Sequence, residues 1–255
     1  MTARLMDFLR ERGVTGADWA VLLGSGLAPL EEPLSPDLVA TYDEMPDWFV
    51  PTVHGHAGRL LTAEVGGRRI LLFEGRNHYY EGNSLRPMHL FADLVHALAI
   101  PRAMITCAVG GVASRLAPGD IFLIEDSINL LFGPPHGLTG TRRGGYYNPL
   151  LCNRFQSCAR ELGLSVERGT LSSVQGPCYE TPAEVRFLAT IGTDVVSMST
   201  VHESALLAER GIEVLGVACV SNVHHPGVEE VNHHGVVGAV AEAARGVGRI
   251  FRKMR

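Results

Sequence analysis

The sequence has no surplus of basic residues and no long hydrophobic run. Its 255 residues include 22 Lys and Arg against 27 Asp and Glu, which gives a formal net charge of −5. Nucleic acids and anionic membranes require a basic face on their partner, so this balance argues against both. No apolar stretch approaches the length of a membrane span, and charged residues stand near the N-terminus instead of an apolar segment. A cytoplasmic protein is expected.

Cysteine pairs and several catalytic signatures are also missing. The five cysteines form no CxxC pair and are odd in number, which argues against a zinc ribbon or a disulfide framework and favours free thiols. His54 and His56 are close in sequence, but no carboxylate or cysteine accompanies them at metal-ligand spacing. There is no GxSxG elbow and no carboxylate pair typical of a glycosidase. The sequence offers neither a metal cluster nor an obvious covalent nucleophile.

The chain does contain an alternation of short apolar runs and amphipathic segments. Strands are predicted at 19–23, 71–73, 103–109, 120–125, 169–174, 194–196 and 214–220. Helices are predicted at 3–12, 87–98, 150–162 and 231–250, with a further helix beginning at Pro182. Residues 29–53 contain five prolines and are expected to be an irregular connection. This alternation predicts an α/β fold with a mainly parallel sheet, although length alone allows one domain or two.

Two loops after predicted strands carry groups suited to an anion. Arg76 and His78 follow the strand at 71–73, although taken alone this loop is better explained as an ordinary surface turn. Ser25 lies in a glycine turn whose backbone N–H groups can face an anion, but the turn lacks both the GK[ST] of a Walker loop and the third glycine of GxGxxG. A plain strand-to-turn connection explains that second loop equally well.

Further polar or small residues share this position after apolar runs. The set is Ser25, Arg76, Ala108, Glu180, Ser199 and Asn222. Because the carboxyl ends of parallel strands meet at one rim of a sheet, these residues are expected to lie together. Local alternatives exist for two of these positions, since Glu180 could be a charge at a helix start and Ser199 or Thr200 could form a capping box with Glu203. An anion held at this rim could itself be the attacking reagent.

Several motifs together resemble the trimeric purine nucleoside phosphorylase family, which includes methylthioadenosine phosphorylases. They are VLLGSGL (21–27), GHAGRL (55–60), EGRNHYYEG (74–82), VGGV (109–112), GDIFLIEDSINL (119–130), QGPCYET (175–181) and MSTVHE (198–203). The resemblance implies a single α/β domain over residues 1–255, with a central mixed, partly barrel-like sheet flanked by helices. It also implies a homotrimer that converts a purine (deoxy)ribonucleoside and phosphate reversibly to free base and (deoxy)ribose 1-phosphate, with no metal or cofactor.

The same resemblance assigns roles to residues at matching positions. Phosphate would be bound by Ser25, His56, Arg76, His78, the backbone of Ala108, and Ser199. The sugar would contact Tyr80, Met198 and His233, and the base Tyr179, Glu180 and Asn222. The catalytic roles would fall to His78, Glu180 and Asn222.

Some positions depart from the family pattern or have no transferable role. The family often has Asn-Ala-Ala-Gly-Gly at 107–111, where Val109 here is expected to narrow the base pocket. It often has Thr-Val-Pro-Glu at 200–203, where this chain has His202. His234 competes with His233 for the sugar position, and the pair at 224–225 is unassigned.

The preferred purine can be predicted from the hydrogen-bond donors and acceptors of the residues assigned to the base. A carboxylate at Glu180 can accept the N1 proton of a 6-oxopurine, and the Asn222 amide can donate to O6 while accepting a proton at N7. Inosine or guanosine is therefore expected over adenosine. The alternatives are a 5′-methylthioinosine or methylthioadenosine phosphorylase, or a nucleoside-binding module without turnover, which would not need a phosphate pocket. Tyr146 or Tyr147 is expected to reach the sugar of a neighbouring subunit.

Overall fold

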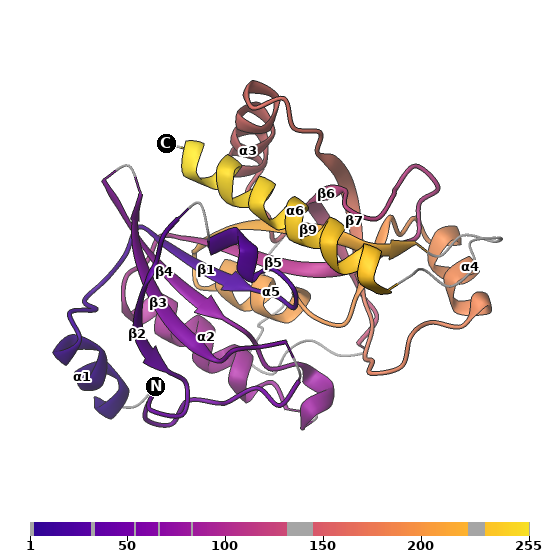
Figure 1. Ribbon diagram of the computed structural model, residues 1–255. Coiled ribbons are helices and arrows are strands. Elements are labelled where there is room, and N and C mark those ends of the chain that lie inside the picture. Colours follow the sequence, from indigo (N-terminus) through magenta and orange to yellow (C-terminus); the bar gives the residue numbers. More distant parts are fainter. Residues whose placement is uncertain are drawn as a thin grey trace.

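A nine-stranded mixed sheet forms the centre of the computed structural model in the part of the chain that it describes (Figure 1). The described residues are 3–31, 34–53, 55–65, 67–82, 84–131, 145–223 and 233–254. The strands are β1 (Trp19–Leu23), β2 (Asp37–Thr41), β3 (Arg59–Val65), β4 (Arg68–Glu74), β5 (Arg102–Gly111), β6 (Ile121–Asn129), β7 (Glu167–Ser173), β8 (Val195–Ser197) and β9 (Glu213–Val223). The helices are α1 (Ala3–Glu11), α2 (Arg86–Ala97), α3 (Pro149–Glu161), α4 (Pro182–Thr190), α5 (Val201–Glu209) and α6 (His233–Lys253), with short 3₁₀ turns η1 (Ala28–Glu31) and η2 (Tyr79–Glu81).

The strand order is β2-β3-β4-β1-β5-β8-β7-β6-β9, and β5 also pairs with β9. The last five strands therefore close into a ring, which confirms the expected partly barrel-like sheet. Of the described strand pairings, five are parallel and four antiparallel. Parallel pairings are therefore in a slight majority, and the sheet is mixed, as the resemblance implied. Antiparallel partners are added by tertiary contacts that the local alternation of strand and helix does not encode.

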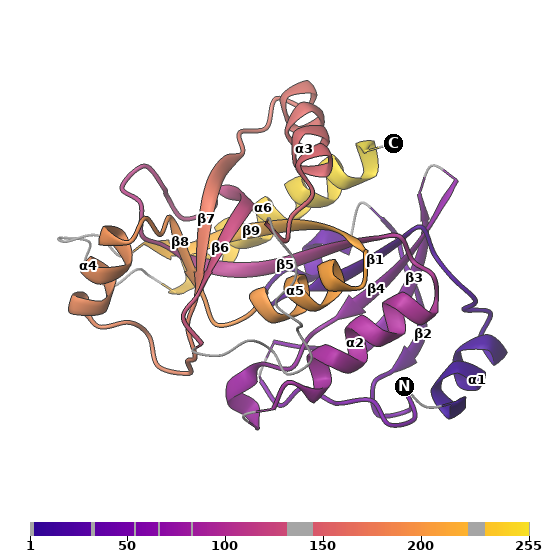
Figure 2. The ribbon, with the colours of Figure 1, turned by 180° about the vertical axis from the view of Figure 1, so that it is seen from behind.

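Helices cover both faces of the sheet. The two opposite views place α6 and α3 on one side and α2 and α5 on the other (Figures 1 and 2). All five residues of β1 are buried, as expected for a central strand covered on both faces. Trp19 at its start packs edge-on against Phe251 of α6, with ring centroids 5.1 Å apart. The core thus locks β1, whose carboxyl end leads into the glycine turn, between the two helical layers.

Local capping explains where two helices begin. Asn148 caps α3 by accepting from the N–H groups of Leu150 and Leu151, and proline occupies the first helical position. At α4, Thr181 and Glu184 form a reciprocal capping box, again followed by proline at the first position. Glu180 thus stands one residue before the cap, and the cap itself is supplied by its neighbour.

The prediction for residues 29–53 is wrong in part, because this segment contains η1 and strand β2. Only Ala40 of β2 is buried, so the strand shows no clear apolar alternation, and it is defined by its antiparallel pairing with β3. Strands β5 and β9 also run further than predicted. They remain paired past a register shift at Val109 and Gly110, which brings Ser221 and Asn222 inside β9.

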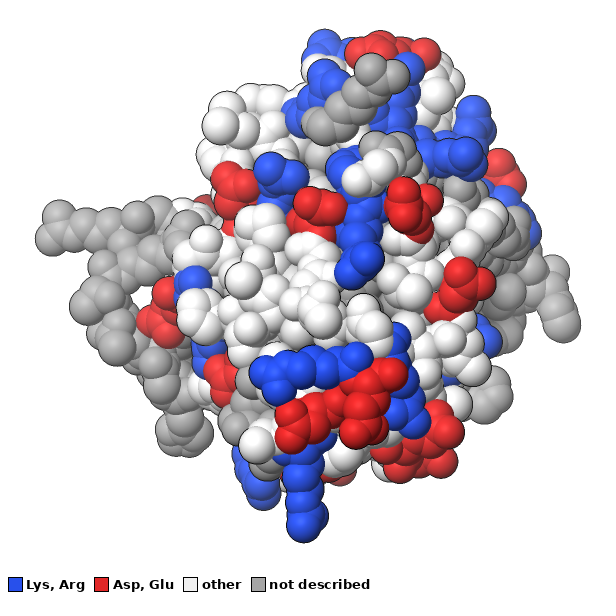
Figure 3. Space-filling view, turned by 90° about the vertical axis from the view of Figure 1, so that its left-hand side faces the viewer, with Lys and Arg blue, Asp and Glu red and all other residues white. Residues whose placement is uncertain are grey.

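The surface carries charges of both signs. On the face seen in Figure 3, Lys and Arg lie next to Asp and Glu around a broad uncharged area, and neither sign dominates. No helix among the described residues is long and apolar enough to cross a membrane.

Candidate functional site

A cavity of about 190 Å³ opens at the carboxyl ends of the central strands. Its lining contains ten of the residues predicted from the sequence: Ser25, Arg76, His78, Tyr80, Ala108, Tyr179, Glu180, Met198, Ser199 and Asn222. Strands β1, β4, β5, β8 and β9, together with the loop after β7, deliver them to one place. The expected convergence of strand ends is therefore observed.

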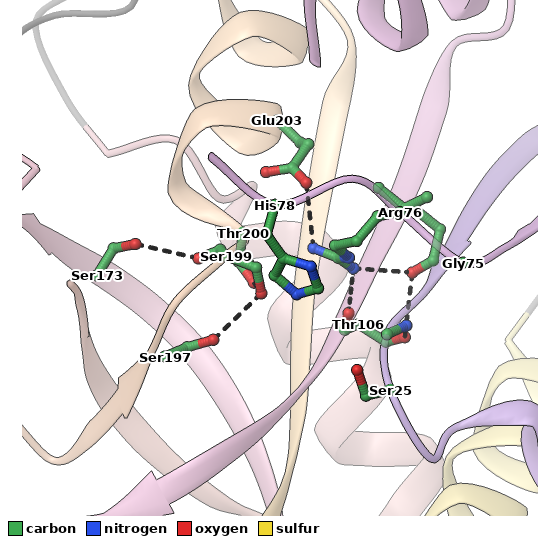
Figure 4. Close-up of polar contacts among 12 residues, drawn as sticks. Ser25, Gly75, Arg76, His78, Thr106, Ser173, Ser197, Ser199, Thr200 and Glu203 are labelled. Carbon is green, nitrogen blue, oxygen red and sulfur yellow. Dashed lines mark hydrogen bonds and ion pairs between the residues drawn. The ribbon is translucent and has the colours of Figure 1, made fainter. Parts of the chain in front are cut away.

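Arg76 is the buried cation of this cavity, with a side chain only 3% exposed. Its Nη1 donates to Glu203 Oε1 at 3.3 Å, and its Nη2 donates to the carbonyl oxygens of Leu22 and Thr106. The hydroxyl of Thr106 donates to the same Leu22 carbonyl and accepts from the Gly24 N–H. The guanidinium is thereby fixed to the ends of β1 and β5, and Figure 4 shows it between Thr106 and Glu203.

The alternative that Glu203 takes part in a capping box is wrong. Thr200 is the N-cap residue of α5, but no side chain makes a capping hydrogen bond there. The Glu203 carboxylate instead turns away from the helix start and pairs with Arg76, 127 residues earlier in the chain. Sequence reasoning missed this residue as part of the site, because nothing in a local pattern distinguishes a capping glutamate from one that pairs across the fold.

His56 lies beside the cavity and orders the hydroxyl of Ser25. The Arg76 N–H donates to His56 Nδ1 at 3.3 Å, so the neutral ring carries its proton on Nε2, which lies 3.0 Å from Ser25 Oγ. Burial and the nearby Arg76 lower the pKa of His56 to about 3, which keeps this ring neutral near pH 7. Ser25 Oγ thus accepts from His56 and keeps its own proton for a ligand.

Gly75 allows this arrangement. Its φ is +108°, and a Cβ at this position would lie 2.9 Å from Cβ of His56. Only glycine combines that backbone conformation with so close an approach.

His78 is held by Glu81. The carboxylate Oε1 accepts from the His78 backbone N–H at 2.5 Å and lies 3.2 Å from Nδ1, while Oε2 accepts from the Thr52 N–H at 2.6 Å. A carboxylate only accepts, so Nδ1 carries a proton. Burial and Arg76 lower the pKa of His78, and the bond to Glu81 opposes the shift. The His78 ring stacks on Tyr80, with centroids 4.9 Å apart.

Ser199 stands in a network of hydroxyl groups at the end of β8. Its Oγ lies 3.2 Å from Ser197 Oγ and 3.2 Å from Thr200 Oγ1, and its carbonyl accepts from the Ser173 hydroxyl at 3.2 Å (Figure 4). Thr200 is fully buried with φ +84°, a strained conformation for a β-branched residue. This strained residue belongs to the turn that presents Ser199.

The cavity lining also includes Tyr179, Glu180 and Asn222. The Ser221 hydroxyl lies 2.8 Å from Asn222 Oδ1 and 3.0 Å from the Val109 carbonyl, so the register shift in β9 holds the carboxamide against β5. Tyr179 is 78% exposed and forms an open side of the cavity. Val109 is buried and also lines the cavity, and the narrowing of the base pocket stays a prediction.

Gly176 lets the loop after β7 pack closely against Met198 and Tyr80, two residues of the cavity lining. Its φ is +71°, and a Cβ there would lie 2.5 Å from Met198 Sδ and 3.0 Å from the Tyr80 ring. A larger residue would push the loop that carries Glu180 away from these two side chains.

The two tyrosines that were candidates to reach a neighbouring subunit differ in their surroundings. Tyr147 is 5% exposed, and its hydroxyl lies 2.9 Å from Ser127 Oγ, so this side chain packs inside its own chain. Burial raises the pKa of Tyr147. Tyr146 is only partly buried. The side chains of His233 and His234, and all of residues 132–144 and 224–232, lie outside the described part.

His202, which has no family counterpart, is buried and contacts the Tyr79 ring edge-on at 6.0 Å between centroids. Burial lowers its pKa, so it serves as a neutral packing group. Among the residues that the structure describes, no group of three His, Cys, Asp or Glu side chains is placed to hold a metal ion.

Comparison with known proteins identifies the family. The phosphorylase superfamily profile matches residues 19–253. The chain is 38% identical over 251 residues to purine nucleoside phosphorylase of Mycobacterium tuberculosis, covering 94% of this chain and 89% of that protein. It is 36% identical over 225 residues to purine nucleoside phosphorylase 1 of Geobacillus stearothermophilus, covering 85% of this chain and 82% of that one.

Solved structures agree. Isoform 2 of purine nucleoside phosphorylase from Schistosoma mansoni, in complex with cytosine and ribose-1-phosphate, superposes with a TM-score of 0.86 at 30% identity and covers 99% of this chain and 94% of that one. The fold, the profile match and the identity to these enzymes over most of the chain lead to one assignment: the chain belongs to the purine nucleoside phosphorylase family of the phosphorylase superfamily.

Proposed function

We propose that this chain catalyses the reversible phosphorolysis of purine (deoxy)ribonucleosides, preferring 6-oxopurines such as inosine and guanosine. The products are the free base and (deoxy)ribose 1-phosphate. The observation that carries the proposal is the set of groups that line one cavity. They are a buried cation with hydroxyl groups, the side chains of Tyr80 and Met198, and a carboxylate with a carboxamide.

The residues around Arg76 are suited to bind inorganic phosphate. Arg76 supplies a permanent positive charge, because a guanidinium is protonated at all physiological pH values. The hydroxyls of Ser25 and Ser199 can each donate to a phosphate oxygen, and His56 orders the first of them. His78 and the backbone of Ala108 complete the phosphate site that the family resemblance implies. Charge-assisted hydrogen bonds of this kind are about twice as strong as neutral ones.

The reaction follows from placing phosphate beside the sugar. The glycosidic C1′–N9 bond breaks with its electron pair leaving on the purine, and a phosphate oxygen forms the new bond to C1′. Positive charge develops on the sugar and negative charge on the base. The phosphate anion stabilises the first, and the N–H donated by the Asn222 amide stabilises the second. The Glu180 carboxylate accepts the N1 proton and so orients the base. Tyr80 and Met198 hold the sugar between them, so positioning lowers the barrier further.

The residues assigned to the base support a 6-oxopurine as the preferred substrate. A carboxylate at Glu180 accepts the N1 proton of hypoxanthine or guanine, whereas N1 of adenine has no proton to give. Relatives do not decide the question, because Schistosoma mansoni purine nucleoside phosphorylase has been solved with adenosine and a schistosoma purine nucleoside phosphorylase with hypoxanthine. The capping of α4 by Thr181 supports the same reading, since the helix start does not need Glu180 as its cap.

The test is base release from inosine in the presence and absence of phosphate. Release that requires phosphate and yields ribose 1-phosphate is expected. Equal release in both buffers would refute phosphorolysis, and binding without turnover would favour a nucleoside-binding module. A panel of inosine, guanosine, adenosine, methylthioinosine and methylthioadenosine then tests the specificity. Comparable kcat/KM for adenosine and inosine would overturn the 6-oxopurine preference.

We also propose that the active form is a cytoplasmic homotrimer of single-domain chains that uses neither a metal nor an organic cofactor, as the family resemblance implies. Full activity after dialysis against a chelator is expected. Activity that disappears and returns with an added divalent ion would contradict the metal-free part.

A further inference from the structure

We propose that Glu203 is a positioning residue of the phosphate site, which fixes the Arg76 guanidinium from behind so that its remaining N–H groups face the anion. This inference rests on the proposed phosphorolysis. Glu203 itself does not line the anion cavity, and it acts through Arg76.

The pair is buried. Both side chains are 3% exposed, with Arg76 Nη1 and Glu203 Oε1 3.3 Å apart. A carboxylate taken so far out of water is costly unless it is paired and hydrogen-bonded. A helix-surface or capping glutamate would have no reason to be buried in this way. The position therefore calls for a role that uses the charge.

The hydrogen bonds of Arg76 show what that role is. A guanidinium has five N–H donors. Three of them go to Glu203, to the Leu22 carbonyl and to the Thr106 carbonyl. Two donors are left, one on Nη1 and one on Nε, and Nε is buried without a partner among the described residues. The protein thus holds three of the five donors, and the other two have no partner among the described residues.

The backbone explains how Glu203 and Ser199 are placed together. The Val201 N–H donates to the Ser199 carbonyl at 3.0 Å, which closes a tight turn centred on Thr200, with φ +84° and ψ −49°. Such a turn is strained for threonine and persists only where surrounding contacts hold it. It presents the Ser199 hydroxyl before the turn and starts α5 after it, so that Glu203 reaches Arg76 from the first turn of the helix.

The primary test is Glu203→Gln, which keeps the shape of the side chain and removes its charge. The apparent KM for phosphate is expected to rise at least tenfold, while the KM for inosine changes less than twofold. Calorimetric titration with phosphate should show the same loss without turnover. Unchanged phosphate binding in a folded variant would overturn the proposal, and so would tighter binding, which would mean that Glu203 competes with the anion for Arg76.

A double-mutant comparison separates positioning from general support of the fold. Glu203→Gln is made in the parent and in an Arg76→Lys background, where an ammonium replaces the planar guanidinium. Positioning predicts that the effect on phosphate KM nearly vanishes in the second background, and an equal loss in both would refute it. Asp93→Asn is the matched control, because Asp93 pairs with Arg210 between α2 and α5 away from the cavity, with Nη2 and Oδ1 2.6 Å apart. Its phosphate KM should equal that of the parent.

If Glu203→Gln does not fold, Glu203→Asp keeps the charge but draws the carboxylate back by one methylene. The same selective rise in phosphate KM is expected, and an unchanged value would overturn the proposal. A parent enzyme without phosphate-dependent turnover would refute the proposed function instead. The calorimetric titration would still decide the role of Glu203.

Discussion

Replacing Arg76 with alanine tests the anion site directly. Two of its five N–H donors have no partner among the described residues, since three go to Glu203, Leu22 and Thr106. A hydrogen bond to a charged group contributes about 1.5–3 kcal/mol, so two such bonds are worth about 3–6 kcal/mol. At about 1.4 kcal/mol per factor of ten, phosphate affinity should fall by about 10²- to 10⁴-fold.

The same substitution has a cost to stability that must be separated from binding. Glu203 would remain buried without its partner, and breaking a buried pair in this way costs about 3–5 kcal/mol. The double variant Arg76→Ala/Glu203→Gln removes the unpaired charge and should recover much of this loss without recovering phosphate binding. Arg59→Ala is a control, because Arg59 pairs with Glu74 from a half-exposed position away from the cavity.

The assay is initial rate against phosphate concentration at saturating inosine, together with phosphate titration by calorimetry and a denaturation curve for each variant. Inosine KM should change much less than phosphate KM. A folded Arg76→Ala protein whose phosphate affinity lies within threefold of the parent would refute the anchoring role of the guanidinium.

Four further outcomes are expected. Ser25→Ala should lower phosphate affinity only about 2- to 13-fold, because a neutral hydrogen bond contributes about 0.5–1.5 kcal/mol. A loss as large as that of Arg76→Ala would contradict the view that Arg76 is the main anchor. Asn222→Asp should raise the adenosine-to-inosine ratio of kcat/KM, and an unchanged ratio would count against the base-site assignment. The folded pKa of His56, about 3, is below its unfolded value near 6.5, so the unfolded state binds more protons and stability falls as pH drops below 6.5. His56→Gln should flatten that fall in denaturation midpoints, and equal slopes would refute the burial effect. Light scattering should give a trimer, and Tyr146→Ala should raise nucleoside KM; a fully active monomer would rule out a shared site.

The sequence by itself determined most elements and the identity of the strand-end residues. Strand β1 was predicted at its observed bounds, because an apolar run that ends in a glycine turn has few other structures available to it. The start of α4 was likewise predicted from Pro182, since proline is favoured at the first position of a helix and disfavoured in its interior. Residues that follow such elements must lie at strand ends, so much of the cavity lining could be named before any contact was known.

The tertiary structure decided what those residues touch. The closure of β5 onto β9, the addition of β2 through β3, and the burial of Tyr147 against Ser127 depend on pairings between distant segments. The clearest case is Glu203, whose local pattern fits a capping box but whose carboxylate meets Arg76, 127 residues away. A local motif indicates only which hydrogen bonds a side chain can make with residues near it in the sequence. Burial decides which bond forms, because a charge left unpaired in the core costs more free energy than a helix-capping hydrogen bond contributes.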